Sequence, residues 1–123
     1  DKCEEEWSFI RSAPIPVEPG KVYFVATKMK IYNVVRSHIK IEAYIENEGK
    51  WISLEPYVPY GKTGSSDWCT YYGIVVIPDG VTSIRVTLNA GWVLDPSQGP
   101  AITWFDDIQV YGPIESWFYG EQR

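Results

Sequence analysis

The single histidine limits the catalytic chemistry open to this chain. His38 is the only histidine among 123 residues, and it follows Ser37 in a strand-like run. A serine–histidine triad needs a nucleophile exposed on a sharp turn, often within Gly-x-Ser-x-Gly, and that sequence does not occur. We therefore interpret His38 as a solvated histidine on the face of a strand rather than as a catalytic base.

The 16 acidic residues are the next candidates for catalysis. Hydrolysis of a glycosidic bond needs two carboxyl groups that face each other across a cleft at a fixed separation. Asp106 and Asp107 are adjacent and cannot provide that separation, while Glu42 and Glu46 have no identifiable second partner. The sequence therefore predicts no catalytic residue and no enzyme.

Cys3 and Cys69 are the only thiols. Two thiols and one histidine cannot supply the four protein ligands of a structural zinc site, so a disulfide or two separate thiols remain. We favour the disulfide because the chain has the character of an extracellular or extracytoplasmic domain. It would close a loop of about 66 residues and stabilise the fold by about 4 kcal/mol in the chain-entropy model.

Charge and composition narrow the range of partners. The formal net charge is −5, which predicts no basic footprint for nucleic acid or for an anionic membrane surface. No run approaches the roughly 20 apolar residues that cross a bilayer, and residues 1–6 do not resemble a signal peptide. Six tryptophans and nine tyrosines supply rings that suit a binding surface as well as a core.

Strands must position these residues, because alternating patterns and turn residues recur while helical periodicity is absent. The clearest strand runs from Ser37 to Asn47. Its apolar face carries Ile39, Ile41, Ala43 and Ile45, and its polar face carries His38, Lys40, Glu42, Tyr44 and Glu46. The run from Thr82 to Asn89 alternates in the same way and forms a second half-buried strand.

Turn residues divide the rest of the chain. We expect further strands over 8–17, 22–35, 51–58, 68–77 and 101–111, and loops over 59–67 and 90–100. Pro56 indicates an edge strand or a bulge. The length suits one core, so residues 1–123 are predicted to form a single all-β domain of about seven strands, with 112–123 as a C-terminal extension.

Four segments occur in a recognisable order: Val-Glu-Pro-Gly-Lys-Val-Tyr (17–23), Asp-Trp (67–68), Val-Ile-Pro-Asp-Gly-Val-Thr-Ser-Ile-Arg-Val-Thr-Leu (76–88) and Trp-Phe-Asp-Asp-Ile-Gln-Val (104–110). As a set they resemble the carbohydrate-binding modules of the family 4/9/22 type. The resemblance implies a galactose-binding-like jelly roll, a β-sandwich of two antiparallel sheets. The glycine- and glutamate-containing opening strand of those modules is not evident here.

The resemblance also directs attention to residues that could hold sugar, since aromatic faces pack on pyranose rings and planar polar groups bind hydroxyls. A groove could be lined by the polar strand faces, with Lys40, Glu42, Tyr44, Arg85 and Asn89, together with His38, Thr87 and Tyr72. A rim platform could instead use Tyr57, Tyr60, Trp68, Trp92 and Trp117. We expect Trp92 to be exposed in its loop, and Trp68 and Trp104 to be buried or half-buried in strands.

A structural Ca²⁺ is a further implication of the resemblance. Asp107 matches the position of its carboxylate ligand, with Asp106 as the neighbour, and the remaining oxygens could come from 4–6 or Glu18. Adjacent strand residues point to opposite faces unless a bulge intervenes, so one carboxylate is the expected ligand. The alternative is that the pair caps a turn or pairs with a lysine.

The sequence thus predicts a non-catalytic module that binds a polysaccharide or oligosaccharide and is fused to a larger extracytoplasmic enzyme or membrane protein. The rival hypothesis is a structural or protein-interaction β-sandwich with no glycan ligand, in which the same aromatic residues are buried or face a neighbouring domain.

Overall fold

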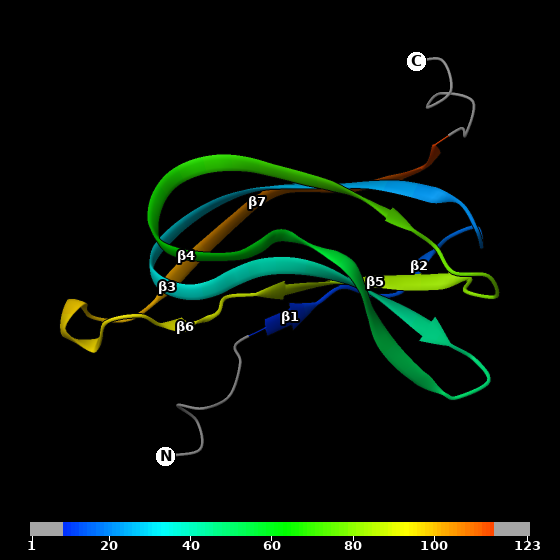
Figure 1. Cartoon of the computed structure of the whole chain (residues 1–123), viewed down its shortest axis with the longest axis horizontal. Helices are drawn as coiled ribbons and strands as arrows, with labels where there is room; N and C mark the ends of the chain where they lie inside the picture. The colour runs from blue at the N-terminus through cyan, green and yellow to red at the C-terminus, as the bar shows by residue number, and fades with distance from the viewer. Residues whose placement is uncertain (1–8, 115–123) are drawn as a thin grey trace.

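The computed structural model describes residues 9–114, and 74% of this range lies in β-strands. Its strands form one antiparallel sheet of seven, and the range contains no α-helix (Figure 1). No helix in this part of the chain is long and apolar enough to span a membrane. The prediction of an all-β chain with about seven strands is confirmed, although the strands share one continuous hydrogen-bonded sheet rather than two.

The strands differ greatly in length. The elements in chain order are β1 (Phe9–Arg11), β2 (Ile15–Pro16), β3 (Val22–Ile45), β4 (Lys50–Val76), β5 (Ser83–Asn89), β6 (Trp92–Val93), the 3-10 turn η2 (Pro96–Gln98) and β7 (Ile102–Ile114). Together β3 and β4 form a long hairpin that contains almost half of the described residues. β5, β6 and β7 pair directly with this hairpin, and β1 and β2 pair with β5.

β3 is the central strand because it is paired along both edges. One edge pairs with β4 over nearly its whole length. Its other edge pairs in turn with β7, β6 and β5, and β5 pairs on its far side with β1 and β2. β4 is an edge strand, as Pro56 predicted, since proline cannot donate a ladder hydrogen bond.

The sheet curves back on itself around the core. Val25 in the first half of β3 and Ile39 and Ile41 in its second half belong to the same buried cluster. Val58 and Val75, from the two halves of β4, join them. The two halves of the hairpin therefore enclose apolar side chains. Figure 1 shows how the ribbons of β3 and β4 bend back so that their two halves lie over one another.

The bend in β3 depends on two residues with positive φ. Asn33 and Arg36 both have φ of 57°, and the β3–β4 register shifts at each of them. Each is thus the extra residue of a β-bulge, and asparagine tolerates this left-handed conformation better than most side chains do. Bulges increase local twist and bend a strand, which lets β3 pass from one half of the folded sheet to the other.

The Asn33 side chain fastens this bend. Asn33 is 1% exposed. Its Nδ2 donates to the carbonyl oxygens of Asp95 and Gly99, both at 2.9 Å, and its Oδ1 accepts from the Asp95 amide at 2.9 Å. Asn33 therefore joins β3 to the β6–η2 segment through three hydrogen bonds made by a side chain that is buried from solvent.

Several predicted boundaries were wrong. Ranges 22–35 and 37–47 are one bent strand, and the predicted loop 59–67 lies inside β4. The predicted strand 8–17 is two short strands, and the predicted loop 90–100 contains β6 and η2. Glycine, serine and polar residues mark bulges in these segments, where the chain keeps its pairing while its register shifts.

Replacing Asn33 by glycine should separate backbone from side-chain effects. Glycine accepts the positive φ but leaves buried amide and carbonyl groups unpaired, so we expect Asn33→Gly to lower the free energy of unfolding by about 2 to 4 kcal/mol. The control Asn47→Gly changes an exposed turn residue and should cost less than about 1 kcal/mol. Urea denaturation measures both, and equal losses would contradict the anchoring role of Asn33.

Candidate functional site

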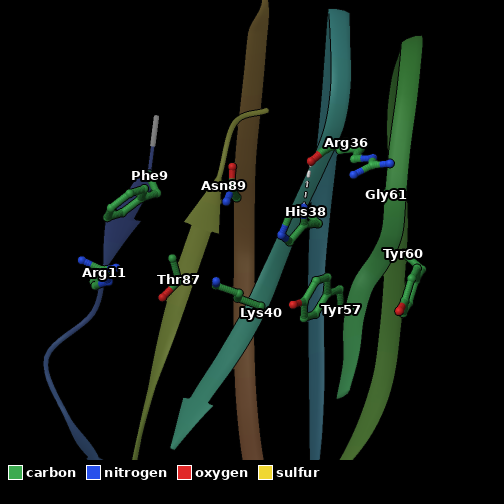
Figure 2. Close-up of a pocket in the computed structure, with 10 residues that line it drawn as sticks. All are labelled: Phe9, Arg11, Arg36, His38, Lys40, Tyr57, Tyr60, Gly61, Thr87 and Asn89. Atoms are coloured by element: carbon green, nitrogen blue, oxygen red, sulfur yellow. Dashed lines mark hydrogen bonds between the residues drawn. The ribbon is translucent and has the colours of Figure 1, made fainter. Parts of the chain in front are cut away.

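A groove of about 650 Å³ lies on the face of β3 and β5 that points away from the core. His38 and Lys40 face the groove, while Ile39 and Ile41, which alternate with them along β3, face the core. Figure 2 shows the side chains that line it: Phe9, Arg11, Arg36, His38, Lys40, Tyr57, Tyr60, Gly61, Thr87 and Asn89. They come from β1, β3, β4 and β5.

Strand register builds the floor of this groove. Residues directly opposite one another in a sheet share a face. Two rows therefore cross β1, β5 and β3 side by side, namely Phe9–Asn89–His38 and Arg11–Thr87–Lys40. A third row, Arg85–Glu42, follows them along β5 and β3. The alternation seen in the sequence of β3 and β5 thus becomes a continuous polar face of the sheet, on which His38, Glu42, Thr87 and Asn89 are buried beneath the neighbouring side chains.

Bulges in β4 supply the aromatic side of the groove. Tyr57 and Tyr60 are three residues apart, so a regular strand would point them to opposite faces. However, Ile39 pairs with Val58 and Ser37 with Lys62, so three residues of β4 lie opposite one of β3. The extra residues change the facing of the chain and bring both tyrosines to the groove (Figure 2).

Three aromatic rings stack beside one another. The His38 and Tyr57 rings lie 5.0 Å apart and 6° from parallel, and the Tyr57 and Tyr60 rings lie 5.5 Å apart and 18° from parallel. Tyr60 is the outer ring and is 71% exposed. Its hydroxyl donates to Oε1 of Glu55 at 3.2 Å, and this bond raises the pKa of Tyr60. The stack therefore presents a supported, neutral ring to solvent.

His38 is buried rather than solvated, so that prediction was wrong. The residue is 5% exposed because Tyr57 covers its ring. A carbonyl oxygen can only accept, so the 2.8 Å contact with the Arg36 carbonyl makes Nδ1 the protonated nitrogen (Figure 2). Burial lowers the pKa of His38, and the nearby charge of Lys40 lowers it further. The neutral His38 ring supports the Tyr57 ring by stacking against it.

Glu42 holds the charged side chains next to the groove. Its carboxylate accepts from Arg85 Nε at 2.7 Å and from the Thr87 hydroxyl at 2.9 Å. Arg11 Nε and Lys40 Nζ lie at 3.5 Å and 3.7 Å. Burial acts to raise the pKa of Glu42, but the hydrogen bonds from Arg85 and Thr87 outweigh it and the pKa is lowered. An ionised Glu42 therefore fixes groove residues without lining the groove itself.

The groove brings together six of the residues that the sequence suggested for a groove or a platform: His38, Lys40, Tyr57, Tyr60, Thr87 and Asn89. Three others, Glu42, Tyr44 and Arg85, lie on the same strands next to it, where Arg85 packs 4.2 Å from the Trp51 ring centre and Tyr44 packs on the same ring. These three side chains support neighbours and do not line the groove.

Two predicted ligand residues lie away from the groove. Tyr72 is 71% exposed on another face, in a cluster with Phe24 and Tyr111. Trp92 is exposed, as expected, and lies on β6 with the Arg36 guanidinium 5.9 Å from its ring centre. The groove and these rings therefore do not form one platform.

The sequence predictions also concern three further tryptophans, two of which lie in the described residues. Trp68 and Trp104 lie in strands, as predicted, but at 46% and 39% exposed neither is part of the core. Each lies on an outward-facing position of a bulged strand, and Lys30 covers the Trp104 ring at 5.1 Å. Trp117 lies outside the described residues.

Four lining residues were not predicted: Phe9, Arg11, Arg36 and Gly61. Phe9 and Arg11 reach the groove because β1 pairs with β5, and no sequence signal reports that pairing. Arg36 reaches it through the bulge, where its positive φ redirects the chain. Only Gly61 carries a sequence signal, because a glycine often marks a position where the backbone needs a positive φ, which is 76° here.

The Asp106–Asp107 pair forms interactions that need no metal ion. A bulge places Asp107 at φ 51°, Asp106 Oδ1 accepts from the Asp107 amide at 2.8 Å, and Lys28 Nζ lies 3.8 Å from Asp107 Oδ2. Gln109 also donates to Asp107. The described residues contain no group of three or more acidic, histidine or cysteine side chains around it. The predicted Ca²⁺ site therefore stays a prediction.

The predicted disulfide involves a residue outside the described range. Cys69 is exposed on β4 and carries a free thiol with respect to residues 9–114. Cys3 lies outside the described residues, as do the glutamates at 4–6. The Cys3–Cys69 bond therefore stays a prediction.

Neither a scan against protein-family models nor a search of curated proteins found a match for this chain.

The buried His38 predicts a pH dependence of stability. The pKa of His38 is lowered in the native state from about 6.5, so the unfolded chain takes up a proton first as the pH falls. Stability is thus complete above about pH 6.5 and declines below it until the native pKa is passed. Because this is the only histidine, His38→Asn should flatten the dependence just below about pH 6.5. An unchanged slope in denaturant titrations would contradict the assignment.

Proposed function

We propose that this domain is a non-catalytic carbohydrate-binding module whose ligand lies in the groove over β3 and β5. The observation that carries the proposal is the exposed ring of Tyr60, supported by Tyr57 and His38 beside a row of hydrogen-bonding side chains. An apolar ring face suits the C–H face of a pyranose, and polar groups at its side suit the hydroxyls.

The polar floor supplies the second half of sugar recognition. Lys40 offers a charged donor, and Asn89, whose Oδ1 accepts from the Gly91 amide, offers the amide Nδ2 on the neighbouring row of the sheet. Thr87 is 1% exposed and its hydroxyl donates to Glu42, so it supports the floor without facing the ligand. Gly61 leaves the β4 side of the groove open beside Tyr60. A sugar chain in this groove would meet a ring on one side and hydrogen-bonding groups beneath it.

Binding without catalysis agrees with the charges at this site. No carboxylate is among the described residues that line the groove, and the adjacent Glu42 is ionised and fully engaged by Arg85 and Thr87. Glycoside hydrolysis needs two carboxyl groups across the bond that is cleaved. This arrangement supports a module that concentrates a substrate for another domain.

The proposal includes a jelly-roll sandwich and an extracytoplasmic location as part of a larger protein. The bent β3–β4 hairpin, with a single core between its two halves, supports the sandwich. A structural Ca²⁺ near Asp107 would have to draw further ligands from residues outside 9–114.

An interaction domain is the second candidate, and one observation favours it. The outer face of β4 and β7 exposes Tyr72, Ile74, Val76 and Tyr111, which together form an apolar surface away from the groove. Contiguous exposed apolar patches commonly mark interaction sites. Such a face could contact a neighbouring domain while the groove remains open, so this candidate predicts binding that does not involve Tyr60.

A matched pair of tyrosines tests the proposed function. Tyr60 and Tyr72 lie on the same strand and are equally exposed, at 71%, but only Tyr60 lines the groove. We expect Tyr60→Ala to weaken glycan binding by about 1 kcal/mol, a roughly fivefold rise in Kd, and Tyr72→Ala to leave it unchanged. Both variants should keep the melting temperature of the wild type within a few degrees.

The measurement is isothermal titration calorimetry with the tightest ligands found on a glycan array. A loss confined to Tyr72→Ala would place binding on the outer face and overturn the groove as the site. If the wild type binds no glycan on the array, the interaction-domain candidate replaces the proposal.

A further inference from the structure

The groove is cationic although the chain is acidic. Arg11, Arg36 and Lys40 line it, and Arg85 lies in the next row. Removing these four from the 11 basic residues, and Glu42 from the 16 acidic residues, leaves 7 basic and 15 acidic side chains for the rest of the chain. The prediction that there is no basic footprint therefore holds for the net charge but is wrong for this face.

Glu42 offsets only part of this positive charge. Its single carboxylate faces Arg85 at 2.7 Å, Arg11 at 3.5 Å and Lys40 at 3.7 Å. Arg36 forms no ion pair with any residue in the range 9–114. Glu55, which accepts from the Tyr60 hydroxyl at 3.2 Å, adds a second carboxylate on the β4 side of the groove. Four cations thus meet two carboxylates, and the positive charge remains in excess at the groove.

The cations surround the space that a sugar chain would occupy. Figure 2 shows Arg11 beside Phe9 on the β1 side, Arg36 beside Gly61 at one end, and Lys40 in the floor between them. A rigid guanidinium fork matches the two oxygens of a carboxylate or sulfate, and it does so more strongly than it matches a hydroxyl. Arg11 on β1 and Arg36 and Lys40 on β3 can therefore contact charges on successive sugar units.

We propose that the ligand of this groove is an anionic glycan, a sugar chain that carries oxyanions such as uronic carboxylates or sulfate esters. The inference rests on the proposed function and names the ligand class of the same site. Arg11 and Lys40 share the single carboxylate of Glu42 with Arg85, and Arg36 has no ion pair among residues 9–114. A neutral sugar would leave this excess of positive charge uncompensated, whereas an anionic chain neutralises it.

Nucleic acid is the other polyanion with suitable chemistry, and the charge distribution disfavours it. Proteins that hold a nucleic acid strand usually extend positive potential along the backbone. Here the cations are confined to one groove, and the acidic excess elsewhere would repel a long phosphate backbone. A short anionic sugar segment meets only the groove.

The test compares charged and neutral forms of the same sugar. Binding of oligogalacturonate is measured by calorimetry beside its methyl-esterified form, and binding of dextran sulfate beside dextran, at low salt and at about 0.5 M NaCl. We expect the charged member of at least one pair to bind tenfold or more tightly at low salt, with the advantage shrinking at high salt. The pair that shows the preference identifies the oxyanion.

A matched pair of cation variants locates the effect. Arg36→Met removes a groove charge that supports no other residue through an ion pair, and it should reduce the preference for the charged sugar at least threefold. Lys50→Met removes an exposed cation at the start of β4, where it pairs with Glu48, and should leave the preference unchanged. Equal effects of the two variants would overturn the groove as the source of the preference.

The remaining outcomes separate this inference from the proposed function. If neutral and charged members of both pairs bind equally, the anionic ligand is wrong and the carbohydrate-binding module stands. If none of the four sugars binds and the glycan array is also blank, the proposed function fails. If a single-stranded oligodeoxythymidine binds more tightly than every charged sugar, the groove holds nucleic acid and the inference is overturned.

Discussion

The bend in β3 is the constraint on which the rest of this structure depends. A strand of 24 residues that stayed straight would carry its apolar residues along one flat face with nothing to cover them. The bulges at Asn33 and Arg36 instead fold the strand, so that its two halves enclose one core. The same bulges orient Arg36 and His38 at the head of the groove. The bulges at Asn33 and Arg36 therefore determine both the bend of the sheet and the position of residues in the groove.

A single buried carboxylate organises the charged part of the site. Glu42 is costly to bury alone, but hydrogen bonds from Arg85 and Thr87 keep it ionised. In turn its charge holds Arg11 and Lys40 close to the sheet instead of leaving them extended into solvent. The aromatic stack on the other side is held by different forces, ring contact and the His38 hydrogen bond. Ion pairs with Glu42 thus hold the charged side chains of the groove, while ring stacking holds its aromatic side chains.

The alternation of apolar and polar residues predicted the polar residues of β3 and β5 beneath the groove. It did not predict how β1 and β4 contribute to the sides of the groove. Ranges 37–47 and 82–89 alternate so regularly that Lys40 and Asn89 could be assigned to one polar face before their strands were known to pair. The glycine- and proline-rich range around Tyr60 was predicted to be a loop, because bulge and turn residues look alike in a sequence. Arg11 could not have been assigned, since its place depends on the distant pairing of β1 with β5. His38 shows the same limit, because the ring that buries it belongs to another strand.

Mapping a bound sugar onto the backbone tests the account most directly. In a titration followed by two-dimensional ¹⁵N–¹H spectra, the account predicts that the largest amide shifts occur in 36–40, 57–61 and 87–89, where β3, β4 and β5 line the groove. Amides in 22–26, 72–76 and 109–114, which lie on the other half of the folded sheet, should stay nearly unchanged. Largest shifts in that second set, with the groove amides unmoved, would contradict the account.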